Sequence, residues 1–180
     1  MRSSKRDHIL DSALRVVAEE GVSAVTFEAV AHASGVTRGG LLYHFPTKDA
    51  LLLAVHEHLA QRWEAELREA LGGDPADATD DEKVAAYARV SVRGVTGPEL
   101  LLMLEARKHP ELSRPWNDVM SRWAPDPAGI SADDPDAIAR MVAYYAADGL
   151  WLGASLGTHV LPRDVRRAAA EYIISALRAH

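Results

Sequence analysis

The sequence predicts an all-α protein of about nine helices, divided into an N-terminal helix-turn-helix domain and a longer C-terminal helical domain. Apolar residues recur at helical spacing along the 180 residues, and no segment shows the alternating pattern of a strand. Hydrophobic residues make up 48% of the chain, with only two Phe, and Ala and Leu are prominent among them. Both observations favour helices throughout.

The first helix is expected to begin near Ser4 and to end at Gly21. Leu10, Leu14 and Val17 follow one another at helical spacing and supply its buried face. The segment is therefore an amphipathic helix that needs partners to cover one side.

Two short helices are predicted next, over residues 27–34 and 37–44. Thr26 and Thr37 are suitable N-caps, and Gly35 stands where a sharp turn favours left-handed backbone. The second short helix then has a compact, partly basic outer face that is narrow enough to enter a major groove of DNA. The residues expected to contact DNA are Thr37, Arg38, Gly39, Leu42, Tyr43, His44 and, at the start of the following helix, Lys48.

These residues have different expected roles. Arg38 should contact a base or a phosphate, because its guanidinium group can bind guanine or a phosphate oxygen. Thr37 and Lys48 have the character of phosphate contacts that set the register on the duplex. Tyr43 and His44 fit the same role, with side-chain packing as the alternative.

The rest of the chain reads as a series of helices separated by Pro, Gly and Asp. We expect a long helix capped by Thr47, and a capping box formed by Thr79 and Glu82 at the start of the next. The expected helices cover about 47–71, 79–93, 97–109, 110–123, 135–158 and 162–179. The predicted domains are residues 1–48 and 49–180.

The charge is unevenly distributed between these domains. The net charge is −6, but residues 1–48 carry six Lys or Arg against five Asp or Glu. The N-terminal part is therefore the less acidic, and phosphate binding depends on its local basic patch.

Targeting signals and cysteine chemistry are not indicated. Residues 1–8 are polar and charged, without the apolar segment of a signal peptide. The most apolar segment, 141–161, holds three Gly and begins without Lys or Arg, which favours a buried helix over a membrane span. The chain has no Cys, which excludes disulfides and thiolate metal sites. We expect a cytoplasmic protein.

Residues 8–55 resemble the TetR family of transcriptional regulators. Capped short helices, a turn glycine and a Tyr-His-Phe-Pro-Thr-Lys junction into a long helix occur together and in order. The residues that carry the likeness are Thr26, Val30, Ala31, Gly35, Val36, Arg38, Gly39, Leu41, Tyr43, His44, Phe45, Lys48, Leu51 and Leu52. Leu42 departs from the pattern, since many members carry Tyr at this position.

The resemblance implies a homodimeric repressor that binds a palindromic operator and is released by a small-molecule effector. It places the dimer interface on the last two long helices, about 135–158 and 162–179. Gly149, Gly153 and Gly157 would give the first of these a smooth strip, which could equally hold a helix of the same subunit. No cofactor is implied.

The effector site is expected among aromatic, Met and His residues of the C-terminal domain, because such side chains suit large apolar ligands. Ordinary core packing is the alternative for each of them. Glu105 could meet a cationic ligand or pair with a neighbouring Lys or Arg. The candidates are Tyr87, Met103, His109, Trp116, Met120, Trp123, Tyr144 and Tyr145.

Other functions have less support. No catalytic motif is present, and His56 and His58 point to nearly opposite sides of a helix, which makes a poor metal pair. The sequence therefore predicts a ligand-responsive transcriptional regulator rather than an enzyme. The alternative is a small-molecule-binding module with a vestigial DNA-binding head.

Overall fold

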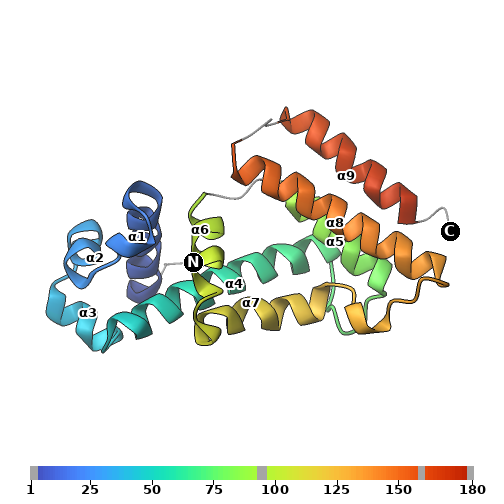
Figure 1. Ribbon diagram of the computed structural model, residues 1–180. Helices are drawn as coiled ribbons and strands as arrows, with labels where there is room; N and C mark the ends of the chain where they lie inside the picture. Colours follow the sequence, from blue (N-terminus) through green and yellow to red (C-terminus); the bar gives the residue numbers. More distant parts are fainter. Residues whose placement is uncertain (1–3, 93–96, 158–160, 178–180) are drawn as a thin grey trace. The chain divides into compact units, whose positions relative to one another are not determined.

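The computed structural model of the protein describes residues 4–92, 97–157 and 161–177 (Figure 1). Within these ranges the regular structure is entirely helical, as the sequence predicted. The α-helices are α1 Lys5–Glu20, α2 Phe27–Ser34, α3 Arg38–His44, α4 Lys48–Leu71, α5 Asp80–Ser91, α6 Gly97–Ala106, α7 Pro110–Trp123, α8 Pro135–Ser155 and α9 Arg163–Leu177. Two short 3-10 turns, η1 Val22–Ala24 and η2 Pro127–Gly129, were not expected.

The chain forms two compact units. Unit 1 comprises Met1–Arg62 and Thr96–Trp116, and unit 2 comprises Trp63–Val95 and Asn117–His180. Helices α4 and α7 each contribute residues to both units. The predicted boundary after residue 48 is a sequence-based division, and it stays a prediction.

Side-chain caps fix where the helices of unit 1 begin. Ser4 and Asp7 form a capping box at α1, in which each side chain accepts from the other residue's backbone N–H at 3.1 Å. Thr26, Thr37 and Thr47 each accept from the backbone N–H three residues later. The starts of α1 to α4 therefore follow from local hydrogen bonds, as predicted.

The core of unit 1 joins α1, α2, α3 and the first half of α4. Phe45 is a core residue and is 2% exposed. Its ring also lies 5.4 Å from the guanidinium carbon of Arg6, within cation–π range. The fully buried residues around it include Ile9, Leu10, Ala13, Val17, Val25, Val30, Leu41, Leu51 and Val55.

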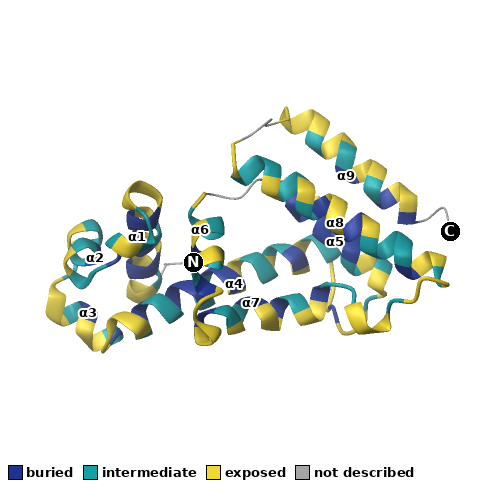
Figure 2. Cartoon of the chain, viewed as in Figure 1, coloured by how far each residue is buried: buried dark blue, intermediate teal, exposed yellow. Residues whose placement is uncertain are grey.

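Unit 2 contains a bundle in which α5, α8 and α9 all contact one another. Figure 2 shows buried residues on α5 and α8, and an α9 that is exposed along much of its length. Many core residues are small, which allows the helix axes to approach closely. They include Ala86, Ala88, Ala143, Ala147 and Ala170.

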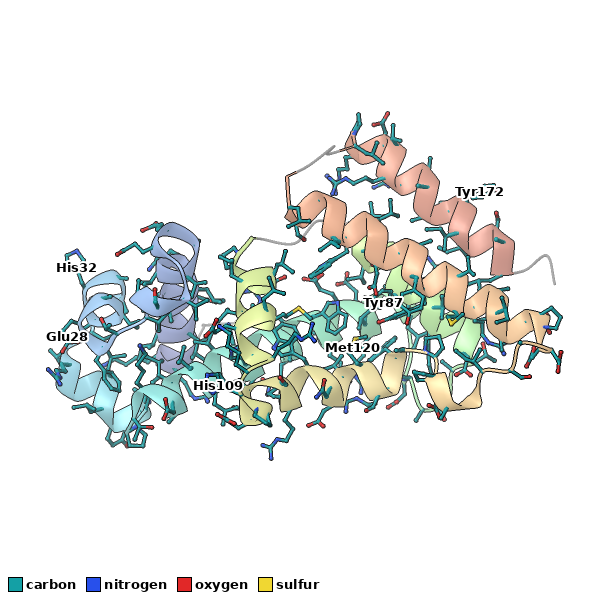
Figure 3. All side chains as sticks on the ribbon, in the orientation of Figure 1. Glu28, His32, Tyr87, His109, Met120 and Tyr172 are labelled. Atoms are coloured by element: carbon teal, nitrogen blue, oxygen red, sulfur yellow. The ribbon has the colours of Figure 1, made fainter. Side chains whose placement is uncertain are left out.

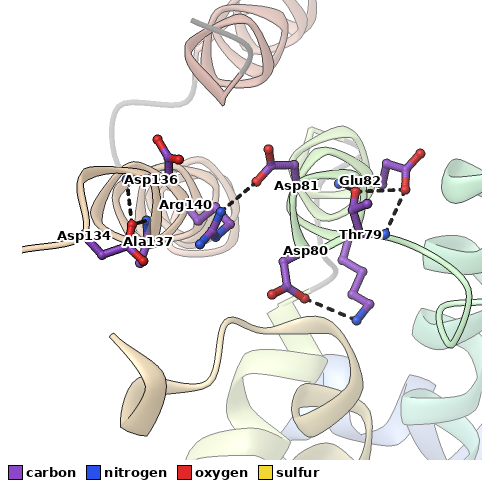
Figure 4. A network of polar contacts seen from close by, with 9 residues as sticks. Thr79, Asp80, Asp81, Glu82, Asp134, Asp136, Ala137 and Arg140 are labelled. Atoms are coloured by element: carbon purple, nitrogen blue, oxygen red, sulfur yellow. Dashed lines mark hydrogen bonds and ion pairs between the residues drawn. The ribbon is translucent and has the colours of Figure 1, made fainter. Parts of the chain in front are cut away.

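Polar contacts fix the ends of this bundle (Figure 4). Thr79 and Glu82 form the predicted capping box at α5. At the start of α8, the Asp134 carboxylate accepts from two backbone N–H groups at 3.1 and 3.0 Å. Arg140 lies 3.5 Å from Asp81, which ties α8 to α5.

Two helix ends differ from the prediction. Helix α6 ends at Ala106 rather than near residue 109. Helix α8 ends at Ser155, so Gly157 lies beyond it with a φ of 66° and is not part of the expected helical strip. Glycine adopts this left-handed conformation without a Cβ clash, which explains why the helix stops there. Along the described residues, no helix combines the length and apolar character that a membrane span requires.

Candidate DNA-binding surface and effector site

The turn between α2 and α3 is set by glycine and by a tightly packed corner. Gly35 has a φ of 67°, in the left-handed region that glycine favours. A Cβ added to Gly40 would lie 2.9 Å from Val36 Cγ1 and 3.3 Å from Thr37 Oγ1. A Cβ added to Gly39 would have no atom of the described residues within 4 Å. Gly40 is therefore required by packing, whereas Gly39 is open on the outer face.

Helix α3 presents the predicted DNA-binding residues to solvent. Thr37, Arg38 and Gly39 are exposed, Leu42 is 40% exposed and Tyr43 is 85% exposed. The opposite side of the same helix buries Leu41 completely. One side of α3 thus packs on the core, and the other side forms a continuous surface that faces solvent.

Tyr43 and His44 differ in their surroundings. Their rings meet edge to face with centroids 5.2 Å apart, and His44 also lies against the Phe45 ring at 6.2 Å. His44 is half-buried, but Tyr43 projects outward. The packing alternative therefore fits His44 better than Tyr43, and their contacts with DNA stay predictions.

Arg38 is engaged by a carboxylate of the neighbouring helix. Its Nη1 lies 2.6 Å from Glu28 Oε1, and both side chains are 65% exposed. Exposed ion pairs contribute only about 0–1 kcal/mol, so a phosphate or a guanine can displace Glu28. The ion pair therefore leaves Arg38 on the outer face and able to exchange Glu28 for another anion.

Lys48 is the first residue of α4 and is exposed. Thr47 accepts from the Ala50 N–H at 3.1 Å, as expected of an N-cap. The first N–H groups of a helix and a nearby Lys both favour an anion, which fits the phosphate contact predicted for this residue.

The eight predicted effector residues are divided between the two units. Met103, His109 and Trp116 belong to unit 1, whereas the other five belong to unit 2. The two groups have different surroundings within their own units.

Within unit 1, Trp116 has a structural hydrogen bond. Its Nε1–H donates to His56 Nδ1 at 2.9 Å, and both residues are buried. Burial lowers the pKa of His56 to about 4, so the ring is neutral and its proton lies on Nε2. His56 therefore pairs with Trp116, while His58 contacts Asp11 at 3.0 Å. The two rings have separate partners, in agreement with a poor metal pair.

His109 lines a cleft of about 590 Å³ in unit 1, with Leu52, Leu101 and Leu104 among its apolar walls. The His109 side chain is exposed, with Nδ1 3.7 Å from Glu111 Oε1. Glu105, at the same cleft, lies 3.1 Å from Lys108. Glu105 thus has Lys108 as an ion-pair partner, and a contact with a cationic ligand stays a prediction.

In unit 2, three of the predicted residues form an aromatic group. The Tyr87 and Tyr144 rings lie 4.6 Å apart, and Tyr145 meets Tyr144 edge to face at 5.7 Å. The Tyr144 hydroxyl lies 3.6 Å from the Met120 sulfur. Tyr87 and Met120 are labelled in Figure 3. Trp123, by contrast, is 1% exposed and is a core residue.

Two residues of this group were not predicted. Trp63 meets the Tyr87 ring edge to face at 5.9 Å, and the Tyr87 hydroxyl donates to Asp148 Oδ1. Burial raises the pKa of the Asp148 carboxyl, and it raises the pKa of Tyr144 to about 12. One sequence signal was available, because Asp148 and His159 are the only charged or His residues in 141–161.

The fold and the α3 surface define a helix-turn-helix DNA-binding protein with a helical C-terminal part. Comparisons with known proteins agree. The family described as "Bacterial regulatory proteins, tetR family" matches residues 9–55, and "Tetracyclin repressor-like, C-terminal domain" matches residues 81–178.

The chain is 31% identical to the HTH-type transcriptional regulator BetI of Rhizobium meliloti, covering 100% of this chain and 93% of that protein. A transcriptional regulator of Pseudomonas aeruginosa PAO1 has a similar fold, with a TM-score of 0.70, 16% identity and coverage of 99% and 93%. Another, from Saccharomonospora viridis in complex with choline, has a TM-score of 0.69, 20% identity and coverage of 94% and 95%. The chain belongs to the TetR family of transcriptional regulators.

Proposed function

We propose that this regulator is a cytoplasmic repressor, which binds a palindromic operator as a homodimer and is released by a small-molecule effector. The exposed face of α3, with Arg38 at its centre, is the observation that carries the proposal. One short helix covers only a few base pairs. Two copies about 34–36 Å apart would bind successive major grooves.

Exposed apolar residues on α8 and α9 support the homodimer. Tyr145 and Tyr172 are 62% and 77% exposed, and further apolar side chains lie along both helices. Gly149 and Gly153 have no atom of the described residues within 4 Å of an added Cβ, which leaves this strip open to a helix of a second subunit. A second subunit would cover these residues, which are Val142, Tyr145, Leu152, Leu156, Val165 and Tyr172.

The aromatic group of unit 2 supports an effector site. Tyr87, Met120, Tyr144 and Tyr145 are the predicted effector residues that gather there. The structurally similar regulator from Saccharomonospora viridis was solved with choline, which favours a small-molecule role for this chain as well.

Release requires an effector that distinguishes two states of the dimer. It must bind the DNA-incompetent state more tightly, because equal affinity for both states shifts no population. We infer that the long helix α4, which contributes residues to both units, acts as the lever that changes the spacing of the two α3 helices.

Fluorescence anisotropy on the duplex upstream of the protein's own gene tests this function, with a scrambled duplex beside it and at two salt concentrations. Arg38→Ala should reduce operator affinity by about tenfold or more. Arg107→Ala is the matched control, because Arg107 is an exposed arginine outside α3. Equal and weak binding of both duplexes by the wild type would instead favour the binding module with a vestigial head.

A further inference from the structure

The aromatic group of unit 2 includes one carboxylate, Asp148, which accepts a hydrogen bond from the Tyr87 hydroxyl. Among the described residues, no ion pair joins Asp148 to Lys, Arg or His, and its recorded hydrogen bond is the one from Tyr87. A half-buried carboxylate without a cationic partner is costly, because desolvation disfavours its charge. The group therefore has unsatisfied negative charge.

Tyr87, which donates a hydrogen bond to Asp148, contacts two further aromatic rings. Trp63 and Tyr144 both contact the Tyr87 ring, at 5.9 and 4.6 Å between centroids. The faces of such rings attract cations, and Trp does so most strongly. Trp63 and Asp148 are only half-buried, so the group is not sealed from solvent.

The small number of ligand atoms and hydrogen-bond acceptors in the group restricts the type of cation that it can bind. A metal ion requires several oxygen, nitrogen or sulfur ligands, and the described residues contain no cluster of three carboxylate, His or Cys side chains. A primary ammonium group needs acceptors for its three N–H donors, whereas Asp148 is the one carboxylate in the group. An alkylated ammonium group needs few acceptors and gains most from rings and a single negative charge.

We propose that Trp63, Tyr87, Tyr144 and Asp148 form a subsite for an organic cation with an alkylated ammonium group. Asp148 supplies the counter-charge, the rings contact the methyl groups, and the Tyr87 hydroxyl holds the carboxylate in position. The inference rests on the proposed effector site and names the chemistry of its ligand.

Isothermal titration of the DNA-free protein tests the subsite with a matched pair of probes. The first is choline, and the second is its neutral isostere, in which a tert-butyl group replaces the trimethylammonium group. The wild type should bind choline at least about tenfold more tightly, because only the cation gains from Asp148 and the ring faces. Equal affinity for the two probes, or no choline binding, overturns the proposal.

Asp148→Asn assigns the selectivity to this residue. The amide keeps the shape and an acceptor for Tyr87, so we expect a folded protein whose choline affinity falls about tenfold and whose affinity for the isostere is unchanged. Asp133→Asn, an exposed loop position in the same unit, is the control for loss of one charge. Circular dichroism checks folding. Unchanged choline affinity in folded Asp148→Asn overturns the assignment.

The proposed function can fail independently of this subsite. Choline binding is measured without DNA, so a protein that binds choline through Asp148 but binds no operator retains the subsite and loses the repressor role. A protein that is released from its operator by neutral compounds and binds no choline retains the repressor role and loses the subsite.

Discussion

The outer face of α3 and the aromatic group of unit 2 are built in opposite ways. The residues of the α3 face lie within about a dozen consecutive positions, are mostly exposed, and owe their orientation to one turn and its caps. The residues of the aromatic group lie on three helices and are buried or half-buried. They are Trp63, Tyr87, Tyr144 and Asp148. A contiguous surface can be read from sequence, whereas a buried cluster depends on which helix faces converge.

Adjacent leucines provide the strongest test of the α3 surface. Leu41 is completely buried and Leu42 is 40% exposed. Leu41→Ala should lower the free energy of unfolding by about 3 kcal/mol, because it leaves a cavity in the core. Leu42→Ala should change it little but alter operator affinity. Urea unfolding and anisotropy measure the two effects, and equal losses of stability would show that α3 is not oriented as described.

The two glycines of α3 form a second pair. Gly40→Ala places a Cβ 2.9 Å from Val36 Cγ1, and relief of this overlap should cost about 1–3 kcal/mol of stability. Gly39→Ala meets no atom within 4 Å and should stabilise the helix by up to about 1 kcal/mol. Thermal unfolding compares them. Similar melting temperatures would contradict the packing of the turn.

Asp148 should make the stability of unit 2 depend on pH. Its folded pKa is raised by burial, so the wild type gains stability as the pH falls through that pKa towards the unfolded value. Asp148→Asn should therefore be the more stable protein at neutral pH, by about 1 kcal/mol, and lose this advantage on acidification. Tyr87 and Tyr144 have raised pKa values and stay neutral throughout.

Melting temperatures of both proteins from neutral to acidic pH measure this difference. Groups other than Asp148 titrate in both proteins, and their effects cancel in the comparison. If the stability advantage of Asp148→Asn over the wild type grew as the pH fell, the surroundings of Asp148 would stabilise its carboxylate rather than penalise it.

The smallest expected effect concerns the ion pair at α3. Glu28→Gln removes the carboxylate that holds Arg38, and a negative charge that would face DNA. Operator affinity should rise a few-fold, since exposed pairs contribute only about 0–1 kcal/mol. Anisotropy at low salt measures the change, with Glu111→Gln, an exposed position in α7, as the control. A loss of affinity would show that Glu28 positions Arg38 for DNA.

The sequence predicted the local features of the fold well, for identifiable reasons. The caps at Ser4, Thr26, Thr37 and Thr79 and the turn at Gly35 are short-range features, and the structure confirms each of them. The end of α6 was placed too late, because the sequence signal used was Pro110 and the helix stops at Ala106.

The candidate effector site was less accessible from sequence. Composition could find Tyr87 and Tyr144 but could not separate them from Trp116, whose indole N–H is bonded to His56 in the other unit. Trp63 lies on a stripe that reads as ordinary core, and Asp148 reads as an isolated polar residue in an apolar helix. Pairings across 61 residues, such as that of Tyr87 with Asp148, depend on tertiary structure.

The Glu28–Arg38 pair also bears on the release of counterions. An unpaired arginine on the surface attracts anions from solution, whereas Arg38 already has a carboxylate at 2.6 Å. When DNA displaces Glu28, one internal ion pair is exchanged for one with phosphate. Because added salt weakens both pairs, this contact should contribute less than the usual slope of about 0.9 per phosphate to the salt dependence of binding. The affinity of α3 for DNA should therefore depend less on ionic strength than the charge of Arg38 alone implies.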